Sequence, residues 1–333
     1  MGRLIVIIAA CTLAAGGCHS SGATSAPLPL RHVADIGLPG RGTRFDYEDL
    51  DPRRHLLIVA HLGDSQVLAV DLDRRRVVWS ASGIESVHGI RVVPELGRVF
   101  ASATGTDQVV ALDESTGAEL GRAETGAFPD GVAFDPVSAR VFVSDKDGGT
   151  VTIVDGRTLD RIGQPHVGGD VGNVQTAPGG GRVFIVVGET NRLLVLDAAT
   201  LSLSTAVGLT GCDGAHGVAV EPSVARAYVA CEQNAALVAV DVAARKVIGR
   251  VRVGDDPDVL ALDPNNRRLY VAAESGVVTV IDTRGRLRVL GRRHLAPGAH
   301  TVAVDSSRGL LALALPNIGG RPALSLYRVT KTR

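Results

Sequence analysis

Aromatic residues are scarce in this chain: they make up 3% of 333 residues, and Trp79 is the only tryptophan. So few aromatic rings argue against a platform on which nucleic-acid bases stack. An excess of one charge is also missing, because 35 basic side chains balance 35 acidic ones and the isoelectric point lies near 7.1. This balance excludes a strong electrostatic footprint for nucleic acid or anionic lipid. We therefore expect no nucleic-acid partner.

Long hydrophobic runs are missing except at the N-terminus. An uncharged apolar run spans residues 4–15, directly after Arg3. It is too short to cross a bilayer as a helix. A basic start, a short apolar run and small residues after it are typical of a secretory signal peptide. The sequence therefore predicts export to the cell envelope.

A cysteine closes this leader. Residues 15–18 read Ala-Gly-Gly-Cys, which resembles a bacterial lipobox, the motif whose cysteine is lipidated and becomes the new N-terminus. We predict a signal peptide over residues 1–18, a lipid anchor to a membrane on Cys18, and a flexible tether over residues 19–29. The protein would then face the periplasm or the exterior. Two alternatives stay open: cleavage near Ala23, which would leave a free periplasmic protein, and a lipobox that ends at Cys11.

The rest of the chain repeats one unit seven times. The repeat is marked by residues spaced 42 apart, except for one spacing of 44: Pro52, Pro94, Pro136, Pro178, Pro222, Pro264 and Ser306. Around each marker a short apolar strand, a turn, a second strand, a third strand and a fourth strand follow one another. Four short strands in about 42 residues, separated by Gly, Pro and Asp, are typical of a β-propeller blade. The sequence predicts an all-β, seven-bladed β-propeller.

The two ends of the repeat predict how the ring closes. The seventh unit, residues 300–329, supplies three strands only. Residues 30–37 resemble the fourth strand of the other units and can complete this last blade. Closure of this kind removes the open sheet edges that invite aggregation. We therefore expect one propeller over residues 30–333.

The units resemble the YVTN family of propeller repeats. Residues 269–273 (Leu-Tyr-Val-Ala-Ala) with residues 278–282 (Val-Thr-Val-Ile-Asp) show the likeness best, and residues 141–143 with 151–155 repeat it. The resemblance spans residues 30–329 and implies the propeller fold. It says little about activity, because similar propellers include binding platforms, lactonases, lyases and relatives of quinoproteins.

Two cysteines remain beyond the leader. Cys212 lies ten residues before Pro222, in the loop that leads into the inner strand of blade five, and Cys231 lies nine after it. Antiparallel pairing brings both to the same propeller face. In an oxidising compartment this arrangement predicts a disulfide, with two buried free thiols as the alternative.

Titratable residues recur at the start of the inner strands, six positions before each marker. We call these positions the ring; its members are Asp46, His88, Asp130, Gly172, His216, Asp258 and His300. Imidazole and carboxylate groups bind divalent transition metals and also act as general acids and bases. We predict that the ring residues converge at one mouth of the channel, with His88, His216 and His300 as candidate metal ligands. The alternative is a purely structural role within the repeat, since an Asp side chain in a turn often forms a hydrogen bond with its own backbone.

Blade one adds polar residues where other units are apolar. Glu48 replaces a branched aliphatic residue, while Asp49, Arg91 and Gln175 occupy the next position in three blades. The predicted ligand-binding set is Asp46, Glu48, Arg91, Asp130, Asn173 and Asp258. The alternative for Asp49 and Arg91 is a structural salt bridge between these two residues of adjacent blades. Four further residues on turns of the same face are interpreted as solvated rim: His61, Asp145, Lys146 and Glu232.

Two functions fit these observations. The first is a lipid-anchored envelope module whose channel mouth binds a small molecule, a metal or a protein, since rigid blades with variable loops suit binding. The second is a metal-dependent lactonase or lyase in which a ring histidine serves as general acid or base, an expectation that rests on the resemblance. One divalent transition metal is the expected cofactor in the second case and a possible ligand in the first.

Overall fold

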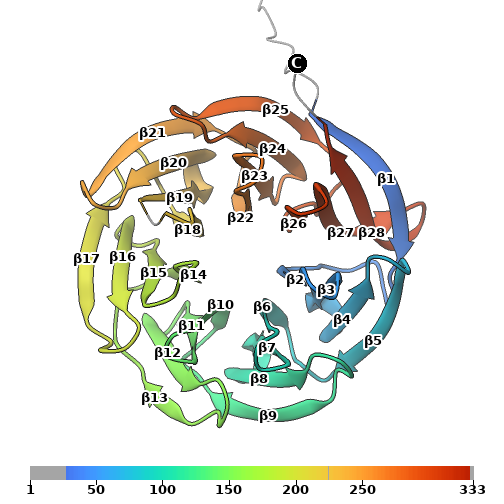
Figure 1. Cartoon of the computed structure of the whole chain (residues 1–333), viewed down its shortest axis with the longest axis horizontal. Helices are drawn as coiled ribbons and strands as arrows, with labels where there is room; N and C mark the ends of the chain where they lie inside the picture. Colours follow the sequence, from blue (N-terminus) through green and yellow to red (C-terminus); the bar gives the residue numbers. More distant parts are fainter. Residues whose placement is uncertain (1–27, 224, 331–333) are drawn as a thin grey trace, which may run out of the picture.

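Seven four-stranded antiparallel sheets stand around a central axis, as the blades of a propeller (Figure 1). The computed structural model describes residues 28–223 and 225–330. The prediction of a seven-bladed β-propeller is confirmed. The predicted signal peptide, Cys18 and most of the predicted tether lie outside the described residues.

Each blade runs outward from the axis in the same strand order. The inner strands are β2 (Glu48–Asp51), β6 (Val87–Val93), β10 (Pro129–Asp135), β14 (Val171–Thr176), β18 (Ala215–Val220), β22 (Pro257–Asp263) and β26 (Ala303–Asp305). The second strands are β3 (Leu56–His61), β7 (Arg98–Ala103), β11 (Arg140–Asp145), β15 (Arg182–Val187), β19 (Arg226–Cys231), β23 (Arg268–Ala273) and β27 (Leu310–Ile318).

The third and outer strands complete the sheets. The third strands are β4 (Gln66–Asp71), β8 (Gln108–Asp113), β12 (Thr150–Asp155), β16 (Arg192–Asp197), β20 (Ala236–Asp241), β24 (Val277–Asp282) and β28 (Arg321–Val329). The outer strands are β5 (Arg76–Ser82), β9 (Glu119–Glu124), β13 (Arg161–Gly163), β17 (Leu203–Gly208), β21 (Lys246–Arg252), β25 (Arg288–His294) and, for blade seven, β1 (Leu30–Gly37). Three short 3₁₀ turns follow second strands: η1 (Leu62–Asp64), η2 (Thr104–Thr106) and η3 (Glu232–Asn234).

Burial follows the position of a strand in its blade. The second strands are rich in Val, Ile, Leu and Ala, and β3 and β23 are buried along their whole length. Both faces of these strands pack against neighbouring blades. Nearly continuous runs of apolar residues therefore suit them better than alternating apolar and polar residues. The outer strands alternate instead, as in β21, because one face is wet. The core therefore lies between the blades, in seven apolar clusters.

The N-terminal strand closes the ring. β1 pairs antiparallel with β28, from Leu30 opposite Val329 to Gly37 opposite Ala323. The Ser325 hydroxyl donates to Asp35 Oδ1 at 2.6 Å across this pair. The predicted completion of the last blade by residues 30–37 is confirmed, and segments about 290 residues apart in the chain share one sheet.

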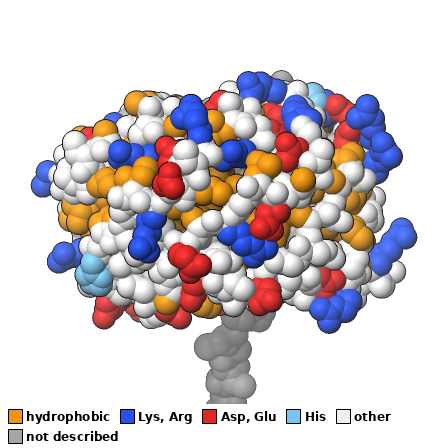
Figure 2. Space-filling model, turned by 90° about the horizontal axis from the view of Figure 1, so that it is seen from below, with side chains coloured by type: hydrophobic (Ala, Val, Ile, Leu, Met, Phe, Trp, Pro, Cys, Tyr) orange, Lys and Arg blue, Asp and Glu red, His pale blue; other side chains and the backbone are white. Residues whose placement is uncertain are grey.

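The outer surface carries both charge signs. On the face shown in Figure 2, acidic and basic side chains are interspersed and separated by small apolar areas. This matches the balanced composition. In the described part of the chain, no helix has the length and apolar character to cross a membrane.

A buried carboxyl pair links Asp51, at the end of the inner strand of blade one, to Glu114, just after the third strand of blade two. Glu114 follows β8 and is 1% exposed. Burial and a hydrogen bond with the Asp51 carboxyl raise the pKa of Glu114 to about 7, while the charges of Arg54 and Arg53 act against this rise. The carbonyl oxygen of Glu114 also accepts a hydrogen bond from Trp79 Nε1 at 2.9 Å.

We expect the free energy of unfolding to fall by about 1–2 kcal/mol as pH rises from 4.5 to about 7. In this window the unfolded chain ionises Glu114, whereas the folded protein keeps its proton. Glu114→Gln retains a donor toward Asp51 and removes the titration, so it should flatten this part of the profile. Urea unfolding followed by the fluorescence of Trp79 measures the effect. The exposed Glu124→Gln is the matched control, and equal slopes for Glu114→Gln and the parent would contradict the prediction.

Candidate functional site

The ring residues come together at the start of the inner strands. A cavity of about 260 Å³ is lined by Asp46, His88, Asp130, His216 and Asp258. These five side chains come from blades one, two, three, five and six, and Asp46, Asp130, His216 and Asp258 are buried. The sixth titratable member, His300 of blade seven, is 1% exposed and lies beside Asp46 and Asp258. The predicted convergence is therefore what the geometry shows.

Glycines let the inner strands approach closely at this level. A Cβ on Gly217, directly after His216, would lie 2.0 Å from the carbonyl oxygen of Asp258 in the next blade. A Cβ on Gly172 would lie 2.8 Å from the Cα of His216. Real Cβ atoms do not approach backbone so closely, so neither position tolerates a side chain without a shift of the neighbouring strand. Gly172 thus explains why blade four has no titratable residue in the ring.

Carboxylates outnumber cations around the cavity. Its lining contains six acidic side chains, Asp46, Asp130, Glu232, Asp256, Asp258 and Glu274, and two cations, Arg44 and Lys146. Burial, followed by the charges of Asp46 and Asp130, raises the pKa of Asp258 well above its ordinary value. The charge of a carboxylate here is costly because water cannot solvate it and its neighbours repel it. A cation in the cavity would reverse that cost.

His300 belongs to one possible set of metal ligands. Neither of its ring nitrogens makes a hydrogen bond, although the side chain is almost wholly buried and Nδ1 lies 3.6 Å from Glu274 Oε2. Ligand atoms of His300, Asp46 and Asp258 all lie within 4.8 Å of one another. One oxygen of Asp258, Oδ1, is likewise buried without a hydrogen-bond partner. Buried polar atoms in proteins are normally hydrogen-bonded, so these orphaned atoms point to a missing partner.

His216 belongs to a second set, with carboxylates on both sides of its ring. Its Nε2 lies 3.6 Å from Asp130 Oδ2 and 3.5 Å from Asp258 Oδ1. On the other side, Nδ1 lies 3.5 Å from Glu232 Oε1. Ligand atoms of His216, Glu232 and Asp258 lie within 4.8 Å of one another. Asp258 is therefore common to both sets.

His88 is oriented differently from the other two histidines. Its Nδ1 lies 2.7 Å from the carbonyl oxygen of Ser86. A carbonyl only accepts, so Nδ1 carries the hydrogen. The other nitrogen, Nε2, lies on the side of Asp46, whose Oδ2 is 3.9 Å away. In the described residues each ligand set holds one histidine, so His88, His216 and His300 do not form a single three-histidine set.

Two cations and a tyrosine complete the cavity wall. Arg44 Nη2 lies 2.6 Å from Glu274 Oε1. Burial acts to lower the pKa of Arg44, but the charges of Asp46 and Glu274 outweigh it and raise this pKa. Burial alone would lower the pKa of Lys146, but nearby Asp and Glu side chains raise it. Tyr47 spans the channel: its hydroxyl accepts a hydrogen bond from Asn173 Nδ2 of blade four at 3.0 Å. Burial and the surrounding carboxylates raise the pKa of the Tyr47 hydroxyl well above its ordinary value.

Three members of the predicted ligand-binding set do not line this cavity: Asn173, which contacts the lining residue Tyr47, and Glu48 and Arg91. Glu48 is buried against blade seven, where its Oε1 accepts the backbone N–H of Ala314 at 2.5 Å. Arg91 lines a separate cavity of about 380 Å³ near the other ends of the inner strands. Its Nη1 lies 3.7 Å from Asp49 Oδ2, which is the inter-blade ion pair considered as the alternative.

The interpretation as solvated rim is wrong for His61 and Asp145, whereas Lys146 and Glu232 are partly buried. His61 and Asp145 are fully buried, and Lys146 and Glu232 line the cavity. Arg44, Tyr47 and Glu274 also line the cavity and were not predicted as site residues. Glu274 lies 42 residues after Glu232, at the same position of the next blade, so the repeat itself held the signal for this residue.

Comparison with known proteins supports the fold alone. The chain resembles a solved structure entitled Kuenenia stuttgartiensis Hydrazine Synthase, with a TM-score of 0.75 at 15% identity over 90% of this chain and 97% of that one. It also resembles a structure entitled Structure of U3-55K, with a TM-score of 0.76 at 10% identity over 89% of this chain and 98% of the other. No model of a known protein family matches the chain, and no curated protein does.

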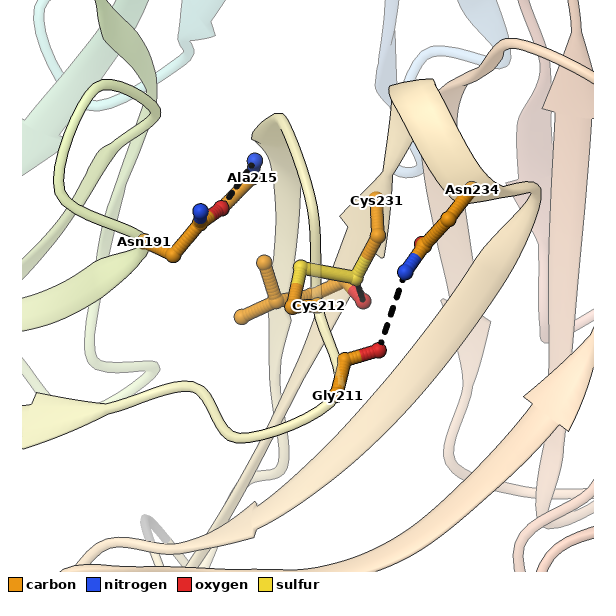
Figure 3. The surroundings of a disulfide bond; sticks show 7 residues. Asn191, Gly211, Cys212, Ala215, Cys231 and Asn234 are labelled. Carbon is orange, nitrogen blue, oxygen red and sulfur yellow. Dashed lines mark hydrogen bonds between the residues drawn. A yellow bond between two sulfur atoms is a disulfide. The ribbon is translucent and has the colours of Figure 1, made fainter.

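The predicted disulfide is confirmed, and it supports one wall of the site. Cys212 and Cys231 are bonded, with their Cα atoms 5.3 Å apart (Figure 3). Cys231 directly precedes Glu232, and Cys212 lies in the loop that leads to His216. Asn234 Nδ2 donates to the Gly211 carbonyl at 3.2 Å across the same loop. The bond therefore ties together the two segments that carry Glu232 and His216.

Removal of this bond should destabilise the protein by about 3 kcal/mol, because a closed loop of 19 residues constrains the unfolded chain. The Cys212→Ser, Cys231→Ser double variant tests this by urea unfolding under oxidising conditions. The parent measured with reductant should approach the variant. An unfolding midpoint equal to that of the oxidised parent would show that the bond contributes nothing.

Proposed function

We propose that this protein is an envelope-anchored binding module whose channel mouth binds a divalent transition-metal ion through Asp46, Asp258 and His300. The observation that carries the proposal is the pair of orphaned ring nitrogens of His300, buried beside two carboxylates. Imidazole nitrogen and carboxylate oxygen are the ligand types that such ions take.

The surroundings fit a bound cation. The cavity holds more acidic than basic side chains, so a divalent ion would neutralise part of an unfavourable buried charge. The ligands come from blades one, six and seven, and the propeller holds their backbones without help from the ion. We therefore expect a folded protein both with and without metal.

We expect Zn²⁺ at about one hundred times its Kd to stabilise the metal-free protein by about 3 kcal/mol, because the ion binds the folded state alone. His300→Ala should show a smaller rise in Tm than the parent at the same Zn²⁺ concentration. Differential scanning calorimetry after treatment with chelator measures both. His294→Ala, at an exposed histidine on outer strand β25, is the matched control. No rise in the parent, or an undiminished rise in His300→Ala, would overturn the proposal.

The anchor is a separate part of the proposal. Lipid on Cys18 would hold the propeller at a membrane surface through the tether that follows it. Cys18→Ser should move the protein from the membrane fraction to the soluble envelope fraction and abolish incorporation of labelled palmitate. An unchanged membrane fraction would count against lipidation at this residue.

The orientation of His88 favours a second candidate function, a metal-dependent lactonase or lyase. Its Nδ1–H is directed at a backbone carbonyl, which leaves Nε2 to accept a proton from a substrate in the cavity. A metal on the His300 set would polarise the substrate oxygen. Turnover of lactones by the parent, lost in His88→Gln while metal binding persists, would favour this candidate over a pure binding module.

A further inference from the structure

We propose that the channel mouth holds a second divalent cation, bound by His216 and Glu232, and that Asp258 bridges it to the first. This inference rests on the proposed function, since the bridge presupposes an ion on Asp46, Asp258 and His300. It makes the site a two-metal centre built from five side chains of four blades.

Asp258 is the reason for placing the two ions side by side. It is the one residue shared by the two ligand sets in the described chain. One carboxylate has two oxygens, so it can offer one oxygen to each ion, as in known two-metal sites. Its Oδ1 has no hydrogen-bond partner and lies 3.5 Å from His216 Nε2. This spacing leaves the oxygen and the nitrogen facing each other without a direct hydrogen bond.

The second set surrounds His216 on both sides. Glu232 Oε1 lies 3.5 Å from Nδ1, and Asp258 Oδ1 lies 3.5 Å from Nε2. Asp130, which is outside this set, places its Oδ2 3.6 Å from Nε2. His216 is 6% exposed, so few waters can reach these groups. The disulfide at Cys231 restrains the backbone that carries Glu232. A metal site needs ligands whose backbone is held in place by the surrounding structure, as the disulfide does for Glu232.

Charge balance points to two ions rather than one. Six carboxylates and two cations line the cavity, which leaves four negative charges when all are ionised. One divalent ion would leave two of these charges, and two divalent ions would leave none. Lys146, whose charge acts on Asp130, Glu232 and Asp258, is the built-in cation that competes with the second ion.

The test counts bound metal on the mature protein stripped with chelator. Equilibrium dialysis against Zn²⁺, followed by elemental analysis, should give about two ions per chain for the parent and about one for either His300→Ala or His216→Ala. Asp258→Asn should weaken both ions. Mn²⁺ in place of Zn²⁺ should give an exchange-coupled electron paramagnetic resonance signal, because a shared carboxylate brings the two ions close together. Lys146→Gln should tighten the second ion several-fold by removing a nearby positive charge.

The outcomes separate the two proposals. One ion in the parent, lost in His300→Ala and kept in His216→Ala, would overturn the second ion and leave the proposed function intact. No ion in the parent would overturn both. Two ions without exchange coupling would overturn the bridge by Asp258. His294→Ala is again the control, and circular dichroism of each variant, with His216→Gln beside His216→Ala, shows that a lost ion is not a lost fold.

Discussion

Seven sheets stay in a ring only if the first and last segments of the repeat meet, and the pairing of β1 with β28 makes that contact. Without it blade seven would end in an open edge, and the blades on either side would lose a packing partner. Glu48 reinforces the same junction through the backbone of Ala314. Closure sets the radius at which the inner strands stand, and that radius brings side chains from five blades into one cavity.

Burying the acidic side chains of the cavity costs the folded protein free energy. Asp46, Asp130 and Asp258 are buried close to one another, although each would be better solvated on the surface. Arg44 and Lys146 offset part of this cost, and the rest remains as an excess of negative charge. A stable fold has no need for such an arrangement, since apolar residues in the same positions would pack without repulsion. Its presence at the mouth of a rigid ring is typical of a site that receives a cation.

The two ends of the channel are built for different purposes. At one end, carboxylates and histidines gather without mutual hydrogen bonds. At the other end, the turn prolines of four blades line a cavity in which Arg91 already has Asp49 as a partner. Tyr47 and Asn173 are hydrogen-bonded across the channel. The same repeat therefore produces a charged mouth and a structural end, because ring positions of several blades line one cavity and turn prolines of four blades line the other.

The repeat in the sequence was enough to predict most of the fold and part of the candidate site. The spacing of about 42 residues determined the blades, and its register determined the ring residues and the pairing of Cys212 with Cys231. These features depend on position within a unit, which a sequence displays directly. Only the tertiary structure decided that Lys146 and Glu232 line the cavity, that Glu48 faces a neighbouring blade, and that Asp258 joins two ligand sets. Such contacts depend on the distance between blades and on the direction of each side chain, and both are set by packing around the closed ring.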